Sequence, residues 1–293
     1  MKKLRYGFFL FCLWLPFTSM AWNALGHKLV AQIAYSNLTP HAKRMFNYYN
    51  HALNKDYKSQ SLISAAIWLD NLRYRNVNWF NSLHYENLFF TEDGTTIPLA
   101  VGNGAVWGMM EAKQVLLRPQ SSDFEKGISL RILLHVVGDI HQPLHAASRV
   151  SKRFPSGDRG GNLVGLGKNS IARNLHTYWD KGGGLWVSQE KLPQAKLALL
   201  ASQIAHKYPC IEGEQLTDFP TWAQESHQLA ITVAYKIHEG EVPDDGYQQR
   251  TQNLSEQRIA LAGCRLASLL NQIDSNASQG HAKPIKHHHK KLY

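Results

Sequence analysis

The residues best suited to chemistry in this chain lie in one apolar stretch, Arg131 to His145, which carries His135, Asp139 and His145. On a helix, residues four apart project from the same face, so the side chains of His135 and Asp139 would point the same way. Pro143 ends that helix and lets His145 turn back toward the pair. Polar donors embedded in an apolar run have to be neutralised, and a metal ion would do this well.

More nitrogen and oxygen donors occur in segments before and after this stretch. They are Trp22, His27, Asp70 and His84 on the amino-terminal side, and the pair His176 and Asp180 on the carboxyl-terminal side. Histidine and carboxylate donors without cysteine are the ligand chemistry of catalytic rather than structural zinc. Each residue alone is more simply interpreted as structural, but the complete set favours a metal centre. Five other histidines lack matching partners and are predicted to be ordinary surface or core residues: His41, His51, His206, His227 and His238. His141 lies in the central stretch but six residues from His135, off its helix face, and is left out of the set.

The segments that carry these donors predict helices almost throughout. Thr39-Pro40 supplies an N-cap and a proline at the first helical position, and Ser122 with Glu125 forms a capping box that opens the central helix. Other helices are predicted at 25–37, 61–74, 105–117, 171–180, 188–207, 220–238 and 253–273, with an extended or loop-like segment at 84–91 and a long loop at 148–168. No alternating pattern is long enough to build a sheet, so the prediction is an all-α, single mainly helical domain.

The first 21 residues predict a secretory signal peptide. A basic start, Met1 to Arg5, precedes an apolar run at 6–17 that is too short to cross a bilayer, and Ala21 ends a small-residue cleavage site. Cleavage there would make Trp22 the mature amino terminus, whose amine and carbonyl could then both act as donors; the alternative is an uncleaved anchor. We expect export to the periplasm or the medium, a domain at 22–275 and a basic, disordered tail at 276–293.

Charge and cysteines add weaker constraints. The formal charge is +10, and loss of Lys2, Lys3 and Arg5 with the signal would leave 10 − 3, or +7. Such a balance suits an anionic partner, either nucleic acid or a phospholipid surface. In an exported protein Cys210 and Cys264 could form one disulfide, although the sequence leaves their pairing open.

Several short motifs occur in an order that is typical of one superfamily. They are Trp22-Asn-Ala-Leu-Gly-His27, Trp68-Leu-Asp70 with Arg73, Ser82-Leu-His84-Tyr85, His135-Val-Val-Gly-Asp139-Ile-His-Gln-Pro-Leu-His145, Asp158-Arg-Gly-Gly-Asn162, Asn174-Leu-His176 with Trp179-Asp180, and Ala262-Gly with Arg265-Leu-Ala267. With them the chain resembles the zinc-dependent phospholipase C/single-strand nuclease superfamily, and specifically the S1/P1-type nucleases or 3′-nucleotidases. The resemblance covers nearly all of the predicted mature chain.

The resemblance implies an all-helical fold with three zinc ions. It assigns Asp70, His84, His135 and Asp139 to one ion, His145, His176 and Asp180 to a second, and Trp22 and His27 to a third that shares Asp139 with the first. A close pair of zinc ions lowers the pKa of a shared water, so a zinc-activated hydroxide can attack phosphorus near neutral pH. Asp139 or Asp70 could orient this nucleophile. Arg73 matches a family arginine that stabilises phosphate charge, although a surface salt bridge is an equally good interpretation.

The resemblance also implies a substrate. Tyr85 occupies the position of an aromatic base platform, and Lys181 stands where some relatives have an asparagine that contacts the base; core packing is preferred for Phe89 and Phe90. The expected function is a secreted nuclease and 3′-nucleotidase that hydrolyses single-stranded RNA and DNA to 5′-mononucleotides. We expect no stable membrane insertion and no obligate protein partner. The alternatives are a zinc-dependent phospholipase C on the same scaffold and a non-catalytic zinc-stabilised surface protein.

Overall fold

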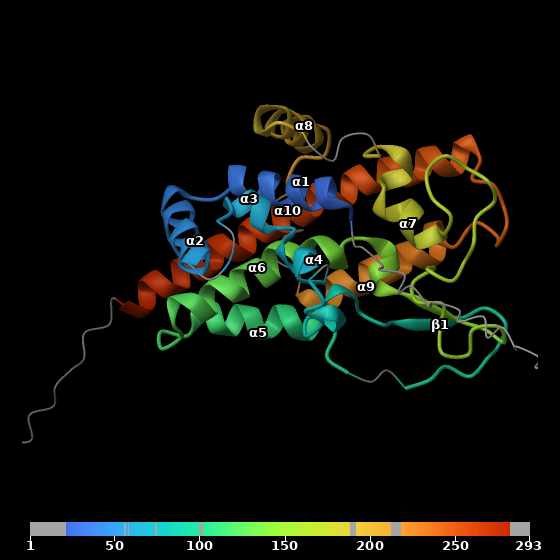
Figure 1. Ribbon diagram of the computed structural model, residues 1–293, viewed down its shortest axis with the longest axis horizontal. Helices are drawn as coiled ribbons and strands as arrows, with labels where there is room; N and C mark the ends of the chain where they lie inside the picture. Colours follow the sequence, from blue (N-terminus) through green and yellow to red (C-terminus); the bar gives the residue numbers. More distant parts are fainter. Residues whose placement is uncertain are drawn as a thin grey trace, which may run out of the picture.

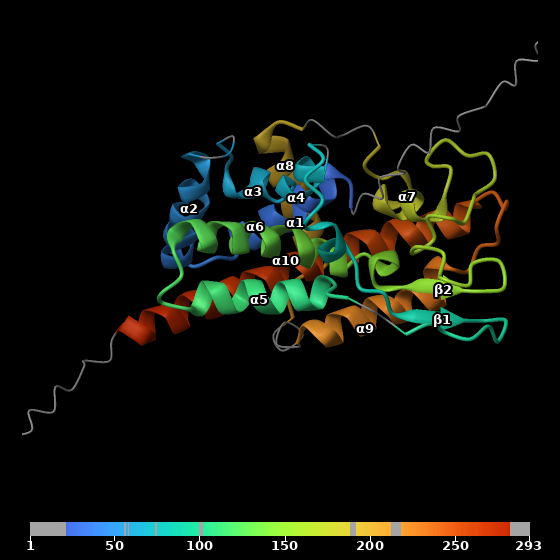
Figure 2. The same ribbon diagram turned by 60° about the horizontal axis from the view of Figure 1, so that its bottom comes forward.

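The computed structural model describes residues 22–55, 57, 59–73, 75–99, 102–187, 192–211 and 218–281. Within these residues the helices form an elongated body along which the last helix runs (Figures 1 and 2). The α-helices are α1 (Ala24–Ser36), α2 (Pro40–Ala52), α3 (Leu62–Ala65), α4 (Trp68–Arg73), α5 (Ala105–Leu117), α6 (Asp123–Ile140), α7 (Leu175–Asp180), α8 (Gln194–Lys207), α9 (Phe219–Leu229) and α10 (Asp245–His281). The predicted all-α class is confirmed.

Shorter elements connect these helices. The 3₁₀ turns are η1 (Leu53–Lys55), η2 (Asn81–His84), η3 (Pro143–Ala146) and η4 (Gly182–Gly184), and η5 (Ala230–Ala234) is a π-helical turn. Strands β1 (Phe89–Thr91) and β2 (Ser148–Val150) pair in parallel, with Phe90 opposite Arg149. This small sheet was not predicted, because three-residue strands are too short to show an alternating pattern.

The two predicted helix starts are confirmed by their caps. The Thr39 side chain accepts a hydrogen bond from the Ala42 N–H at 3.0 Å, before Pro40 at the first position of α2. At α6 the capping box is complete, since Ser122 Oγ accepts from the Glu125 N–H at 3.2 Å and the Glu125 carboxylate accepts from the Ser122 N–H at 2.7 Å. These caps satisfy backbone donors that have no partner inside a helix.

Two predicted helices are interrupted where the backbone is used for other contacts. The segment 61–74 forms α3 and α4 with a turn between them, because the Ala66 carbonyl accepts a hydrogen bond from His135 instead of continuing the helix. The helix predicted at 171–180 begins only at Leu175, since residues 166 and 173 pair across a short hairpin. Asn174 then caps α7 by accepting from the Thr177 N–H at 2.8 Å.

The later helices also differ from their predicted bounds. α9 ends at Leu229 and passes into the π-helical turn η5, so the helix predicted at 220–238 is too long. α10 begins at Asp245 and continues to His281, into the segment predicted as a tail. The predicted signal peptide and residues 282–293 lie outside the described residues.

α6 is the centre of the packing. Fourteen of its residues are buried, and it contacts α1, α2, α4, α5 and α10. Phe90 lies in a second, smaller apolar cluster with Tyr235, as expected for a core residue. A disulfide joins Cys210, beyond the end of α8, to Cys264 of α10, with 5.6 Å between their Cα atoms. No helix among the described residues is long and apolar enough to cross a bilayer.

Candidate metal centre

Three groups of buried histidines and aspartates lie together at the junction of these helices. The groups are His27, His135 and Asp139; Asp70, His84 and His135; and His145, His176 and Asp180, and within each group the donor atoms lie within 4.8 Å of one another. None of these eight side chains is more than 4 % exposed. The structure therefore brings together all eight predicted side-chain donors from α1, α4, η2, α6, η3 and α7.

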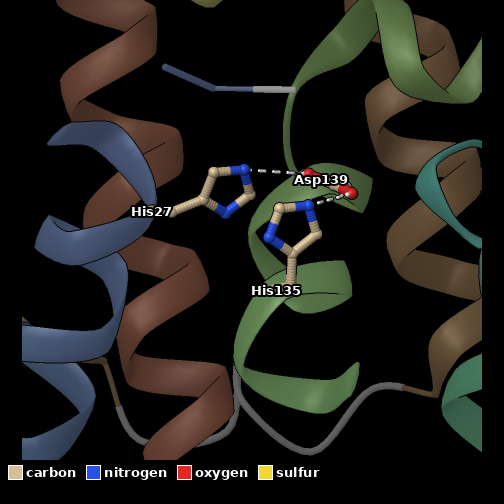
Figure 3. Close-up of side chains that lie close together, drawn as sticks. All are labelled: His27, His135 and Asp139. Atoms are coloured by element: carbon tan, nitrogen blue, oxygen red, sulfur yellow. Dashed lines mark ion pairs between the residues drawn. The ribbon is translucent and has the colours of Figure 1, made fainter. Parts of the chain in front are cut away.

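Asp139 lies between the first two groups. Its Oδ1 is 3.2 Å from His27 Nε2, and its Oδ2 is 3.3 Å from His135 Nε2 and 3.1 Å from His84 Nδ1. Figure 3 shows His27 from α1 and the α6 pair, His135 and Asp139, directed toward one another. The spacing of four residues therefore places His135 and Asp139 on one face, as predicted.

A glycine allows α1 to approach α6 this closely. The imidazoles of His27 and His135 are stacked with centroids 3.9 Å apart. A Cβ added at Gly138 would lie only 2.9 Å from His27 Nδ1. Any side chain at residue 138 would therefore push His27 away from Asp139.

Backbone carbonyls fix the orientation of three imidazoles. His135 Nδ1–H donates to the Ala66 carbonyl at 2.6 Å, His176 Nδ1–H to that of Gly160 at 2.7 Å, and His145 Nδ1–H to that of His84. A carbonyl only accepts, so in the neutral rings each Nε2 must carry a lone pair. Second partners of this kind are what hold metal-binding histidines in one tautomer.

The lone pairs of two of these rings face each other. Nε2 of His145 lies 3.0 Å from Nε2 of His176, and Asp180 oxygens lie 3.7 and 3.6 Å from the two nitrogens. Two acceptors at hydrogen-bond distance repel each other unless a cation lies between or beside them. A metal ion held by two imidazoles and a carboxylate fits this donor set.

Several buried polar atoms of the centre also lack hydrogen-bond partners among the described residues. They are Nδ1 of His27, Nε2 of His84, both oxygens of Asp70 and Oδ2 of Asp180, whereas Nε2 of His27 and Oδ1 of Asp139 lie 3.2 Å apart as an ion pair without forming a hydrogen bond. A buried polar atom without a partner costs free energy, and such atoms are rare in folded proteins. Because these atoms are gathered in one buried place, a bound metal ion would give them the partners that the protein does not, and the donor set therefore fits metal binding.

The environment divides the donors into two protonation classes. Burial lowers the pKa values of His27, His84, His145 and His176, which keeps these rings neutral and able to coordinate. Burial would also lower the pKa of His135, but Asp139 and Asp70 outweigh it and raise that pKa to about 9. The cationic His135 and neighbouring His27 hold the pKa of Asp139 well below its usual range, despite burial. Burial raises the pKa of Asp180 to about 8.

We expect zinc binding to release protons and to weaken as the pH falls. His135 and Asp180, with pKa values of about 9 and about 8 without metal, both hold protons at pH 7 and must lose them to coordinate. Below both values, each displaced proton lowers the apparent affinity by about tenfold per pH unit. Titration calorimetry at pH 7 in two buffers with different ionisation enthalpies would count the protons. Equal apparent heats in both buffers would contradict this expectation.

Each of the remaining predicted site residues lies within five residues of a donor along the chain. Trp22 is fully buried against Trp186, and the Asn23 N–H donates to the Asp180 carbonyl at 3.0 Å. Arg73 is the last residue of α4, and Tyr85, directly after His84, is 41 % exposed rather than a core residue. Lys181 follows α7, and its ammonium donates to the Ile171 carbonyl at 2.9 Å.

Some supporting residues could not be found from the sequence. Gln142 is fully buried and donates to Asp180 Oδ1 at 2.7 Å, and Gly160 supplies a carbonyl to His176. His141, which belongs to none of the three donor groups, donates from Nδ1 to the Val137 carbonyl and accepts from Arg265 at 3.0 Å. A glutamine or a backbone carbonyl has no characteristic spacing in sequence. The only sequence signal for Gln142 is that it lies within the motif from His135 to His145.

An all-α fold with buried groups of histidine and aspartate donors is the organisation expected of a helical metallohydrolase. The model of the S1/P1 nuclease family matches residues 22–275, and the chain belongs to this family. It is therefore an enzyme, a hydrolase of the nuclease class.

Related proteins from plants and fungi match nearly end to end. Endonuclease 2 of Arabidopsis thaliana is 25 % identical over 298 residues, covering 93 % of this chain and 98 % of that protein. Nuclease P1 of Penicillium citrinum is 25 % identical over 86 % of this chain and 97 % of its own length. Nuclease S1 of Aspergillus oryzae is 25 % identical over 88 % of this chain and 93 % of its own length.

Proposed function

We propose that this chain is an exported, zinc-dependent nuclease and 3′-nucleotidase that hydrolyses single-stranded RNA and DNA to 5′-mononucleotides. The observation that carries the proposal is the junction of donor groups around Asp139 in a member of the S1/P1 nuclease family. His84 links the third group to the other two, because its carbonyl accepts from His145. The geometry thus supports one continuous centre rather than separate structural sites.

The donor groups would hold three zinc ions. Asp70, His84, His135 and Asp139 would hold the first, His145, His176 and Asp180 the second, and Trp22 and His27 the third with Asp139 shared. When bound, zinc would lower the pKa of water, supplying hydroxide near neutral pH, and would neutralise charge on the phosphate.

The other roles belong to the side chains of the chain itself. Asp139, held between His27 and His135, or Asp70, whose oxygens accept no hydrogen bond from the described residues, would orient the attacking nucleophile toward phosphorus. Arg73 would donate two parallel hydrogen bonds to the phosphate, a task suited to a guanidinium. Tyr85 is exposed directly beside His84, so its ring is available for stacking on an unpaired base. Lys181 would contact the base only after giving up its hydrogen bond to Ile171.

An assay of the zinc-reconstituted protein on two substrates tests this function. Single-stranded RNA should be hydrolysed to 5′-mononucleotides, and phosphatidylcholine should not be turned over. Turnover of the lipid without hydrolysis of RNA would identify a phospholipase C on the same scaffold. Full zinc loading with no hydrolysis of any phosphodiester would identify a non-catalytic zinc protein.

We also propose that the chain is exported and cleaved after Ala21. The family match starts at residue 22, and the Cys210–Cys264 disulfide suits an oxidising compartment, whether periplasmic or extracellular. Trp22 is fully buried, and the Asn23 N–H donates a hydrogen bond to the Asp180 carbonyl. The mature amino terminus would therefore be held against the metal centre.

One extra glycine before Trp22 is therefore expected to remove one of the three zinc ions. An amide nitrogen replaces the amine, so the five-membered chelate of amine and carbonyl cannot form. Zinc content measured by atomic emission on the extended and mature proteins would check this result, together with amino-terminal sequencing of the exported protein. A mature start elsewhere than Trp22, or full zinc loading in the extended protein, would rule out the chelate.

A further inference from the structure

A cavity of about 510 Å³ opens between α1, α4 and the segment before α3. Figures 1 and 2 both show α1, α3 and α4 close to one another. This cavity, which we call the α4 pocket, is lined by two cationic side chains, Lys28 and Arg75. The polar side chains that line it are Gln60, Ser61, Ser64 and Asn71. None of the described residues that line the cavity is acidic, and neither Lys28 nor Arg75 forms an ion pair with a described residue.

A third cation lies behind the wall of this α4 pocket. Arg131 of α6 is fully buried, and its guanidinium lies 5.5 Å from the centroid of the Trp68 ring, which lines the pocket. Nε donates to Asn50 Oδ1 at 3.0 Å and Nη2 to Asn54 Oδ1 at 3.2 Å, but Nη1 has no partner. Although burial lowers the pKa of Arg131 to about 10, the group is still cationic at neutral pH.

The charge of Arg131 is balanced by no carboxylate among the described residues. Burying a cation without a counter-charge is costly, and the low dielectric around it extends its field. The same asparagines connect it to the pocket, since Asn50 donates to the Gln60 carbonyl at 2.7 Å and Asn54 accepts from the Gln60 N–H at 3.2 Å. The field of Arg131 thus adds to that of Lys28 and Arg75.

The α4 pocket is separate from the metal centre but close to it. Trp68, Asn71 and Leu72 line the pocket from one face of α4, whereas Asp70 projects from the opposite face into the centre. On α1, Lys28 directly follows His27. One helix, about 10 Å across, therefore separates the two sites.

We propose that the α4 pocket binds a phosphate group of a nucleotide, carried either by the strand being cleaved or by a free mononucleotide. Cations that form no ion pair with a described residue, surrounded by hydroxyl and amide donors, suit a phosphate. The guanidinium of Arg75 can donate two parallel hydrogen bonds to two phosphate oxygens. Naming the anion as a nucleotide rests on the proposed function, whereas the preference for an anion does not. A strand phosphate bound here would anchor the substrate on the far side of α4 from its cleaved bond.

The test compares two variants of the zinc-loaded protein that lose the same charge. Lys28→Gln with Arg75→Gln removes the pocket cations, and Arg44→Gln with Lys236→Gln removes two exposed cations outside the pocket. The probe is a fluorescent, phosphorothioate-linked single-stranded 12-mer, whose binding is followed by anisotropy at several salt concentrations. Calorimetry with a 5′-mononucleotide provides the second arm.

If the α4 pocket binds a phosphate of the strand, the pocket variant should bind the 12-mer about tenfold more weakly at low salt. The slope of log affinity against log salt should then be smaller in magnitude by about 1.4. For a free mononucleotide, 12-mer binding should be unchanged and a second bound equivalent of nucleotide should be lost. The proposal is overturned if the pocket variant matches the control variant in both arms. Strand binding that depends on the pocket, in a protein without hydrolysis, would instead reject the proposed function alone.

Discussion

Replacing Asp139 with asparagine is expected to abolish hydrolysis of single-stranded RNA, lowering kcat/KM by at least about 10³-fold. The loss should exceed the roughly 10- to 100-fold cost of removing a hydrogen bond to a metal ligand, because Asp139 contacts both His27 and His135. Asparagine keeps the shape but not the charge, so one carboxylate no longer serves two ions. Zinc content should fall from three ions to about one, the ion of His145, His176 and Asp180.

Asp274→Asn is the matched control for this substitution. Asp274 is also a buried carboxylate beside a histidine, with 2.6 Å between Oδ1 and His41 Nδ1, but it belongs to none of the three donor groups. The control should keep its zinc and its activity, whatever stability it loses. Metal analysis and steady-state kinetics on both variants would check the pair of results. Wild-type activity in the Asp139 variant would exclude the shared carboxylate.

The donor side chains could be predicted because residue type and spacing are enough to indicate metal-binding chemistry. His135 and Asp139 share a helix face, and Pro143 allows η3 to carry His145 back toward the centre, as the sequence indicated. His176 and Asp180 repeat the same spacing on α7. Histidine and aspartate side chains are rare in apolar helices, so their spacing can be recognised without knowledge of the fold.

The features that orient the donors could not be predicted in the same way. The acceptors for His135 and His176 are backbone carbonyls of Ala66 and Gly160, and every residue has a carbonyl. The contact with Ala66 also explains why the helix predicted at 61–74 is broken: a tertiary hydrogen bond replaced a helical one. Local propensity yields to such contacts wherever the metal centre needs a partner.

Close packing explains a further part of the site that spacing alone did not reveal. A glycine inside a helix is by itself only a weak helix former, yet a Cβ at Gly138 would lie 2.9 Å from Nδ1 of His27 on α1. Likewise, Lys28 and Arg75 are distant in sequence from Arg131 and become one positive region only when α1, α4 and α6 pack together. Such features depend on which helices are neighbours, which short-range patterns do not specify.

Chelation of zinc is expected to destabilise the protein strongly as well as inactivate it. Without metal, the facing nitrogens of His145 and His176 and the oxygens of Asp70, which accept no hydrogen bond from the described residues, would stay buried. A ligand present at 1,000 times its Kd stabilises by about 4 kcal/mol, and each kcal/mol shifts Tm by about 2–4 °C in a domain of this size. The expected fall in Tm is therefore about 8–16 °C.

Differential scanning calorimetry of the oxidised protein with and without chelator would measure this fall, and returning zinc should reverse it. The Cys210–Cys264 disulfide is unaffected by the chelator, so any change in Tm reports on the metal centre alone. The Asp139→Asn variant provides the internal comparison: if it has already lost the ions that share Asp139, chelation should lower its Tm by much less. An equal fall in both proteins would mean that the stabilising ion is the one held by His145, His176 and Asp180. No fall in the wild type would show that the buried donors are satisfied without metal, which would contradict the metal centre itself.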